Sequence, residues 1–229
     1  MTTGSSTNSA PDDVDLEAQL AQAQRALRAS EQRETHLRRE LEHRVRNVLA
    51  VSRSILARTL ATATSVESAR SHLSGRLDAL ARYQGRTVAM LGADFDLETM
   101  IWDELLAVAS AGDPRIVVDG PSTEIAPQVA EVIGLALHEL VTNSVKFGVL
   151  AGPSAVGKLA IEWRVHSGEI DLHWSESGVP IVSSAPLESG FGQDYIEHAL
   201  PYQLGATTSF ELVPGGMRCR MLFLADTRG

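Results

Sequence analysis

The 229-residue sequence has a single cysteine, Cys219, so no disulfide can form within the chain. A lone thiol in the alternating run GMRCRMLFLA is typical of a buried strand residue in a reducing compartment. No apolar run approaches the roughly 18 residues that a membrane-spanning helix needs. The N-terminal stretch MTTGSSTNSAPDD also lacks the apolar core of a signal peptide. These absences predict a cytoplasmic protein that does not have a membrane as a partner.

Positive charge is scarce as well. The chain has 20 Lys and Arg against 29 Asp and Glu, a formal net charge of −9. Nucleic acids and anionic lipid surfaces are bound chiefly through cations, so we expect neither as a partner. The arginines that cluster between Arg25 and Arg58 alternate with glutamates, which indicates a mixed-charge helix surface and not a basic tail.

Proline and glycine are absent between Val14 and Leu60, a stretch rich in strong helix formers. We therefore predict a helix of over 40 residues, followed after ATATS by a second helix that runs to Gly92. Thr64 or Ser65 is a candidate N-cap of the second helix. Apolar residues recur along the first helix at one heptad position, at Leu20, Leu27, Leu41, Val48 and Ile55. A second apolar face follows at Leu73, Leu77, Leu80, Val88 and Leu91.

Two such helices form an αα-hairpin that exposes too much apolar surface to be stable alone. Pairing with a second copy would give a four-helix bundle, so we expect a homodimer; alternatively, the C-terminal half of the same chain covers the hairpin. We assign residues 1–13 to a disordered lead and 14–92 to the hairpin with its N-terminal coiled-coil extension. Residues 93–229 form a second domain.

The second domain mixes helical and strand patterns. Helices are predicted over ADFDLETMIWDELLAVASA, APQVAEVIGLALHELVTNSVKFGVL and GFGQDYIEHALPYQL. PRIVVDG is a predicted strand, and KLAIEWRVHSGEIDLHWSES and TTSFELVPGGMRCRMLFLA are predicted β-hairpins. Since the order has no βαβ rhythm, we predict an α+β fold with helices on one face of a sheet.

Two segments present polar side chains in patterns that suit chemistry. In ELEHRVRNVLA, His43 lies about 200° from the apolar seam at Leu41, and Asn47 is one turn further along the same side. An outward histidine alone is usually an ordinary solvated residue. In ALHELVTNSVKFGVL, one helix face carries Glu139, Asn143 and Lys146. This row is either a solvated edge of the helix or a site for an anionic, Mg²⁺-bound ligand. In the second case it would supply a carboxylate, a carboxamide oxygen and an ammonium.

Two further segments are weaker signals. HWSESGVP ends a strand at Glu176, and Gly178 allows a flat ligand to approach the backbone closely. GFG, with Gly190 and Gly192, opens a helix whose free amides favour phosphate. Each pattern is also what an ordinary strand exit or turn produces.

Taken together and in order, these segments resemble the HWE family of bacterial sensor histidine kinases, within the GHKL ATPase superfamily. LEHRVRNVLA is similar to the phosphoacceptor box, with His43 in the histidine's place, and GRLDALAR resembles the matching stretch of the second hairpin helix. ALHELVTNSVKFGVL resembles the N-box, including His138. WSE supplies Trp174 and Glu176, and GFG resembles the glycine pair after the ATP lid. The resemblance covers about Leu41 to Leu224.

The resemblance implies a dimeric helical hairpin followed by a GHKL, Bergerat-type α/β sandwich that binds ATP and Mg²⁺. It implies that His43 attacks the γ-phosphate and that the phosphoryl group then passes to an aspartate of a response regulator receiver domain. Glu139 would orient or deprotonate the nucleophile, and Asn143 would hold Mg²⁺. Lys146 would contact phosphate and Glu176 would accept from the adenine amino group. The glycines implied to let backbone approach the nucleotide are Gly178, Gly190 and Gly192.

Some positions remain open. His138 either steers Glu139 or is a packed helix histidine. Val179 stands where the family usually has a second glycine, and Asp194 places negative charge where it usually has an arginine; both predict a weakened ATP site. The alternatives to a kinase are therefore a phosphotransfer adaptor and a response-regulator phosphatase. We expect a stand-alone kinase core that receives its input from a separate sensor protein.

Overall fold

A computed structural model of the chain describes residues 10–63, 65–89, 93–108, 112–152, 157–179 and 191–226. The chain divides into two compact units, Met1–Ser54 and Ile55–Gly229. Most of the predicted disordered lead and the predicted domain boundary near Gly92 lie outside the described residues. The division of function between hairpin and second domain at that boundary therefore stays a prediction.

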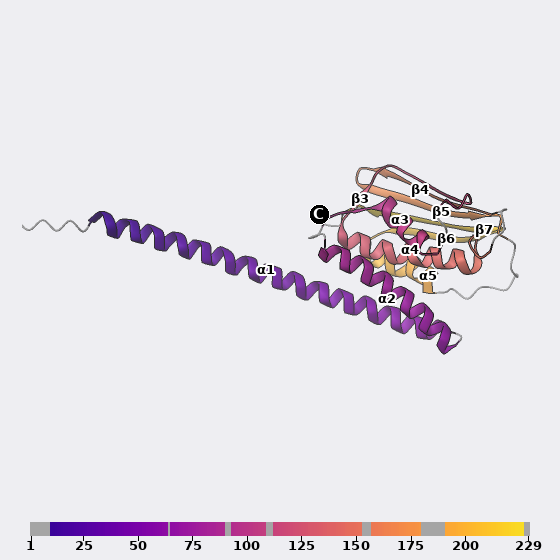
Figure 1. Cartoon of the computed structure of the whole chain (residues 1–229), viewed down its shortest axis with the longest axis horizontal. Helices are drawn as coiled ribbons and strands as arrows, with labels where there is room; N and C mark the ends of the chain where they lie inside the picture. The colour runs from indigo at the N-terminus through magenta and orange to yellow at the C-terminus, as the bar shows by residue number, and fades with distance from the viewer. Residues whose placement is uncertain are drawn as a thin grey trace, which may run out of the picture. The chain divides into compact units, whose positions relative to one another are not determined.

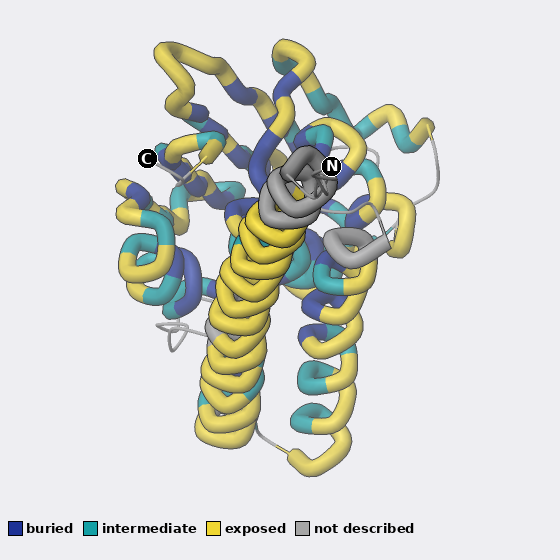
Figure 2. The backbone as a smooth tube through the Cα atoms, turned by 90° about the vertical axis from the view of Figure 1, so that its left-hand side faces the viewer, coloured by how far each residue is buried: buried dark blue, intermediate teal, exposed yellow. Residues whose placement is uncertain are grey.

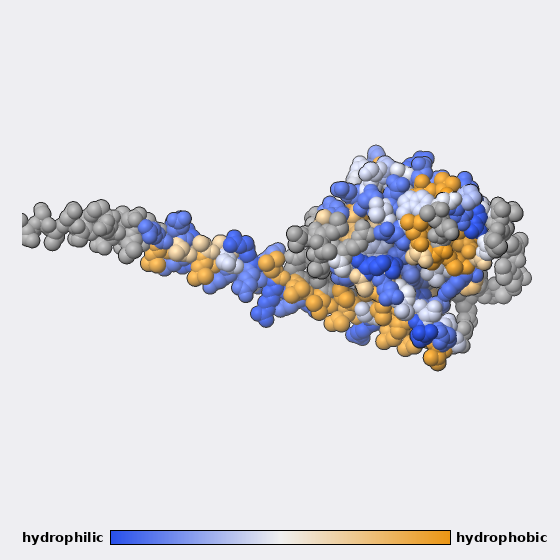
Figure 3. Space-filling view, viewed as in Figure 1, coloured by the Kyte–Doolittle hydropathy of each residue, from blue (hydrophilic) through white to orange (hydrophobic). Residues whose placement is uncertain are grey.

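The first helix, α1 (Ala10–Thr62), is continuous and begins earlier than the predicted boundary at residue 14 (Figure 1). Most of its described residues upstream of Ile55 are exposed, as Figure 2 shows. The predicted seam is among them, since Leu20, Leu27 and Leu41 expose 59%, 59% and 62% of their surface. Hydrophobic and hydrophilic residues alternate along this surface (Figure 3). An apolar stripe of this kind is stable in water only when something covers it.

The second helix, α2 (Val66–Ala89), begins at the predicted N-cap. The Ser68 amide donates to Ser65 Oγ at 3.1 Å, which selects Ser65 over Thr64 as the capping residue. The helix packs on α4 (Pro127–Phe147), and Ala79, Leu80 and Tyr83 are buried as a result. The C-terminal half of the same chain thus covers the inner face of α2. For this part of the hairpin, this is the alternative to covering by a second copy of the chain.

A five-stranded sheet in the order β2-β4-β5-β7-β6 forms the second layer. The pairs are antiparallel except β2–β4, which is parallel with α4 between the two strands in sequence. The expectation that the order contains no βαβ pattern is therefore wrong at this one unit, where α4 is the crossover helix. A two-stranded ladder, β1–β3, was not predicted because each strand has only two residues. The elements not yet given are β1 (Phe95–Asp96), α3 (Leu97–Leu106), β2 (Ile116–Asp119), β3 (Glu124–Ile125), β4 (Lys158–His166), β5 (Glu169–Ser177), α5 (Phe191–Asp194), the π-helix η1 (Tyr195–Ala199), α6 (Leu200–Leu204), β6 (Thr207–Val213) and β7 (Gly216–Leu224).

Helices α4 and α5 lie on one face of this sheet (Figure 1), which confirms the predicted α+β class. Alternate strand residues face them, so that Leu159, Ile161 and Trp163 of β4 are buried. Both predicted hairpins are present, and the first turns at Ser167 and Gly168, whose φ angles are 51° and 82°. None of the described helices is long and apolar enough to cross a bilayer.

The contact between α2 and α4 gives a first prediction. A Cβ added at Gly134 of α4 would lie 2.1 Å from Cε2 of Tyr83, so Gly134→Ala must push the two helices apart. The substitution should lower the thermal unfolding midpoint, although alanine is the better helix former by about 1 kcal/mol. Gly85→Ala in α2 is the matched control, because a Cβ there meets nothing within 4 Å, and it should raise the midpoint. Equal midpoints for the two variants would contradict close packing of α2 on α4.

Candidate functional site

The row predicted on α4 lies along a gradient of burial. Glu139 is 3% exposed, Asn143 is half-buried, and Lys146 is exposed near the end of the helix. Because the three residues are four and three positions apart, they lie on neighbouring turns of one face. A ligand on this face would meet a dry carboxylate at one end and a wetter ammonium at the other.

Glu139 is held by an arginine from the hairpin that the sequence did not single out. Arg76 of α2 donates from Nε to one carboxylate oxygen of Glu139 at 2.7 Å and from Nη2 to the other at 3.0 Å. Its Nη1 donates to Thr59 Oγ1, near the end of α1, at 2.8 Å. Arg76 and Thr59 are 6% and 1% exposed, so this is a dry, bidentate ion pair. Such pairs are among the strongest hydrogen-bonded arrangements in proteins.

The start of α5 completes this cluster. The Arg76 guanidinium lies 3.7 Å from the ring centroid of Phe191, close enough for a cation–π interaction. A Cβ on Gly192 would lie 3.1 Å from Asn143 Nδ2 and 3.2 Å from Glu139 Oε2. A side chain at position 192 would therefore crowd both polar groups, and glycine allows the α5 backbone to approach the α4 row closely.

Glu176, at the end of β5, lies next to the other end of α4. Its Oε2 accepts from the Val149 amide at 2.9 Å and its Oε1 from Trp174 Nε1 at 3.1 Å. The carboxylate is 4% exposed, and each oxygen keeps a second lone pair for a further donor. Gly178 follows with φ 74°, a conformation that favours glycine. The described residues of the predicted nucleotide site thus lie along α4, with Gly192 near Glu139 and Asn143 and with Glu176 near the C-terminal end of the helix.

Lys146 also has a partner in the hairpin. Its Nζ lies in a short hydrogen-bond contact with Nε2 of His72 on α2. Burial lowers the pKa of Lys146, against the pull of Glu139. Burial also lowers the pKa of His72, and the positive charges of Lys146 and Arg76 lower it further while Glu139 opposes them. A neutral His72 is the form whose ring nitrogen can accept a hydrogen bond from the lysine ammonium.

A third contact gives a partner to Asp194, the negative charge at a position where the resembled family usually has an arginine. Asp194, at the end of α5, accepts from Arg58 Nη1 of α1 at 3.0 Å. The two side chains are 37% and 34% exposed, so the pair is only partly shielded from water. Hairpin residues therefore contact α4 and α5 at Glu139, Lys146 and Asp194.

His138 belongs to a separate polar cluster beside this face. Its Nδ1 lies 3.0 Å from Glu104 of α3, which also accepts from Arg82 at 2.6 Å and from the Tyr83 hydroxyl at 3.0 Å. Burial opposes ionisation of Glu104, but the hydrogen bonds from His138 and Arg82 outweigh it and hold the pKa of Glu104 below its usual range. A Cβ on Gly75 would lie 3.1 Å from His138 Nε2. Of the two roles left open for His138, these contacts favour that of a packed helix histidine.

Sequence reasoning missed Arg76 and Glu104, although both leave a signal. Arg76 lies three residues after Leu73 and four before Leu80, on the apolar face of its helix. Glu104 likewise follows Met100 and Ile101 on the buried face of α3. A charged residue on a buried face needs a partner, and each of these residues has one.

The structure does not describe the side chains of three predicted positions. His43 lies within α1, but its side chain and that of Asn47 are outside the described part of the structure, and Gly190 lies outside the described residues. The outward direction of His43 therefore stays a prediction.

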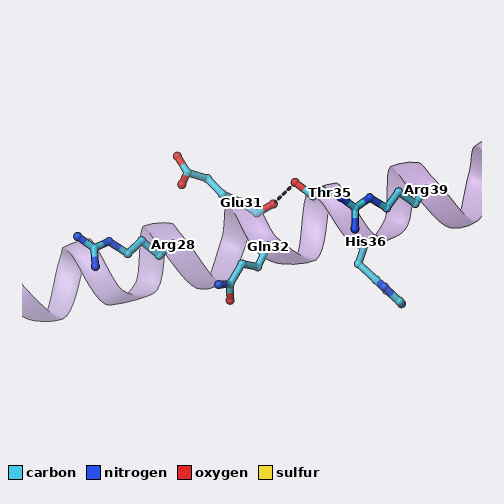
Figure 4. A pocket seen from close by; sticks show the side chains of 6 residues that line it. All are labelled: Arg28, Glu31, Gln32, Thr35, His36 and Arg39. Carbon is cyan, nitrogen blue, oxygen red and sulfur yellow. Dashed lines mark hydrogen bonds between the residues drawn. The ribbon is translucent and has the colours of Figure 1, made fainter.

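Two other features of the described residues do not form a site. A shallow depression on α1 is formed by side chains of that helix alone, with Thr35 Oγ1 donating to the Glu31 carbonyl at 2.8 Å (Figure 4). This is an ordinary polar helix surface. Within the described residues, no group of three or more His, Cys, Asp and Glu side chains could hold a metal ion. The predicted Mg²⁺ ligand, Asn143, is not part of such a group, since its oxygen donor is a carboxamide, which is among the oxygen ligands that Mg²⁺ accepts together with waters and substrate phosphates.

The contact between His72 and Lys146 predicts a pH dependence. The pKa of His72 is lower in the folded chain than its ordinary value of 6.5, so the unfolded chain binds more protons. The contribution of neutral His72 to the free energy of unfolding is therefore fully present above pH 6.5. It is lost as the pH falls through the pKa that His72 has in the folded chain. Between about pH 7.5 and about pH 5.5, the free energy of unfolding should fall more in the wild type than in His72→Gln. Parallel pH profiles in urea titrations of the two proteins would contradict this.

Comparisons with known proteins show which sequences this chain is similar to. The sequence model of the HWE histidine kinase family matches residues 40–122. Blue-light-activated histidine kinase 1 of Erythrobacter litoralis is 32% identical over 181 residues, which make up 77% of this chain and 46% of that protein. A blue-light-activated histidine kinase of Brucella anthropi is 31% identical over 183 residues, or 78% of this chain and 37% of that protein. The chain thus spans less than half the length of these curated relatives.

Solved structures show the same fold. The blue-light activated histidine kinase EL346 of Erythrobacter litoralis matches with a TM-score of 0.57 at 17% identity, covering 82% of this chain and 61% of that one. Its histidine kinase domain alone matches with a TM-score of 0.50 at 16% identity, covering 78% of this chain and 94% of the domain. At these identities the likeness concerns the fold alone, which is the predicted helical hairpin with a GHKL-type sandwich. On the family match and the two relatives, this chain belongs to the HWE histidine kinase family.

Proposed function

We propose that this protein is an ATP-dependent protein-histidine kinase of a two-component system, which phosphorylates itself on His43 and passes the phosphoryl group to an aspartate of a response regulator. The observation that carries the proposal is the approach of Gly192 to Glu139 and Asn143. A carboxylate, a carboxamide and a close backbone are the parts that a phosphoryl-transfer site needs, because such sites act mainly by positioning and by neutralising charge.

The roles of the residues follow from their chemistry. His43 is the proposed nucleophile, since an imidazole with an ordinary pKa near 6.5 is largely neutral at physiological pH. Glu139 orients that imidazole or takes its proton, and Lys146 neutralises phosphate charge. Asn143 holds Mg²⁺ through its carboxamide oxygen; when bound, this ion supplies neutralisation of the charge that develops on the phosphate oxygens.

The remaining positions concern the base of the nucleotide. Glu176 is buried at the end of β5, and its free lone pairs would accept from the adenine amino group. Gly178, with its left-handed backbone, and Gly190 would let the chain pass close to the nucleotide. Gly192 is the third glycine of the proposed site.

The proposed partners are a second copy of the chain, a response regulator receiver domain and a separate sensor protein. The exposed seam of α1 supports the homodimer, because Leu20, Leu27 and Leu41 lie at heptad spacing with their side chains in solvent. A four-helix bundle built from two hairpins would bury that seam.

A second candidate function is a phosphotransfer adaptor or response-regulator phosphatase that does not use ATP. The full engagement of Glu139 by Arg76 favours it, since a carboxylate in a bidentate pair is not available as a base. Binding of Mg·ATP separates the two functions, because an adaptor has no use for it.

The phosphoacceptor can be tested with ATP labelled at the γ-phosphate. The wild type should take up label that is stable in alkali and lost in acid, and His43→Ala should take up none. His36→Ala is the matched control, because His36 is an exposed histidine of the same helix and should label normally. Equal labelling of His43→Ala and the wild type would remove His43 from the mechanism.

The role of Asn143 can be tested by binding. Asn143→Ala should weaken Mg²⁺-dependent ATP binding about tenfold or more, since it removes an oxygen that holds the ion. Thr142→Ala, at the neighbouring half-buried position, should bind as the wild type does. Isothermal titration with and without Mg²⁺ measures both. Unchanged Mg·ATP affinity in Asn143→Ala would remove the proposed metal ligand.

A further inference from the structure

Arg115, the residue before β2, is bound to the segment that follows α4. Its Nη1 donates to the carbonyl oxygens of Val149 at 2.8 Å and of Gly152 at 2.6 Å. Its other two nitrogens donate to the carboxylate of Asp113, Nε at 3.0 Å to Oδ1 and Nη2 at 2.7 Å to Oδ2. The side chains of Arg115 and Asp113 are 15% and 13% exposed, so most of the solvent is kept from these bonds.

Asp113 fixes the direction of the Arg115 guanidinium. Its carboxylate occupies the Nε and Nη2 side of the planar fork, which leaves Nη1 for the two carbonyls. The same carboxylate accepts from the backbone amide of Arg115 at 3.0 Å. The side-chain hydrogen bond from Arg115 is the main cause that lowers the pKa of Asp113 to about 2, so the pair is ionised at neutral pH. Arg115 is therefore oriented before it meets the segment after α4.

Val149 is held at both of its backbone polar groups. Its carbonyl accepts from Arg115, and its amide donates to Oε2 of Glu176 at 2.9 Å. Because the backbone of a residue has only two soft dihedral angles, a turn of the carbonyl is passed on to the amide. Arg115 thus controls the direction of a hydrogen bond that Glu176 receives.

The carboxylate of Glu176 has little room to turn. A Cβ added at Gly148 would overlap its Oε2, so that oxygen lies directly against the backbone before Val149. Its Oε1 accepts from Trp174 Nε1 at 3.1 Å. With one donor on each oxygen, the carboxylate plane is set and the remaining lone pairs have set directions. A purine amino group must meet those directions, since hydrogen bonds weaken steeply as they bend.

We propose that Arg115 is a positioning residue for purine selectivity. By holding the carbonyls of Val149 and Gly152, it aims the Val149 amide at Glu176 and fixes the carboxylate that distinguishes a 6-amino purine from a 6-oxo purine. The proposal rests on the proposed function, because it takes Glu176 as the acceptor of the adenine amino group. A 6-oxo purine presents an acceptor to this carboxylate and is rejected by it.

The test compares Mg·ATP with Mg·ITP, in which an oxo group replaces the amino group of the base. Competition with a fluorescent ATP analogue gives both dissociation constants for the full chain and for Arg115→Met, Arg115→Lys and Glu176→Gln. Arg164→Met is the control, because Arg164 is an exposed arginine of β4. Both constants come from one sample, so a smaller folded fraction in a variant leaves their ratio unchanged. Hydrogen exchange of the Val149 amide, measured by NMR without nucleotide, is the second readout.

Arg115→Met should weaken ATP binding about three- to tenfold and change ITP binding by less than about twofold, because only the amino group depends on the direction of the carboxylate. The Val149 amide should exchange faster in the same variant. Arg115→Lys should lie between it and the wild type, since an ammonium lacks the fork that spans Asp113 and the carbonyls. Glu176→Gln should lose the preference, because a carboxamide can accept from an amino group or donate to an oxo group. Arg164→Met should match the wild type.

Equal weakening of ATP and ITP binding in Arg115→Met would overturn the proposal, because Arg115 would then support the site only as a whole. Unchanged exchange of the Val149 amide would overturn it as well. If Glu176→Gln removes the preference and Arg115→Met keeps it, the nucleotide site stands and the positioning role alone is lost. If the wild type binds neither nucleotide, the kinase proposal fails and the selectivity role fails with it.

Discussion

The ion pair between Arg76 and Glu139 is the constraint on which the second compact unit depends. It joins α2 to α4 through two hydrogen bonds, and the third donor of Arg76 reaches Thr59 at the end of α1. Separating a buried pair of this kind costs about 3–5 kcal/mol, because a charge is left dry without its partner. The apolar contacts around it, such as Tyr83 against Gly134, fix the distance at which the helices pack.

The same pair links stability to function. Glu139, the carboxylate to which the proposed function assigns the handling of the nucleophile, is the same residue that joins α4 to the hairpin through Arg76. His138 and Gly75 lie beside Glu139 and Arg76, so two consecutive residues of α4 meet two consecutive residues of α2. The two boxes that the family resemblance treats separately are thus in contact in this chain.

The architecture was predictable from the sequence because it depends on periodic patterns. The absence of proline and glycine between Val14 and Leu60, the cap at Ser65 and the alternation in β4 gave the helices and hairpins nearly at their observed bounds. The contacts between α2 and α4 were not predictable, because they join residues 63 positions apart through side chains. The partners of the site residues therefore emerged only in three dimensions, and Arg58 explains Asp194 in a way that no local pattern could.

A double-mutant cycle on Arg76 and Glu139 tests the central claim most directly. Arg76→Met, Glu139→Gln and the double variant would be unfolded in urea and their free energies of unfolding compared with the wild type. If the pair holds the hairpin on α4, each single variant should lose about 3–5 kcal/mol, and the double variant should lose clearly less than the sum. Strictly additive losses would contradict the account, because the two residues would then stabilise the fold independently.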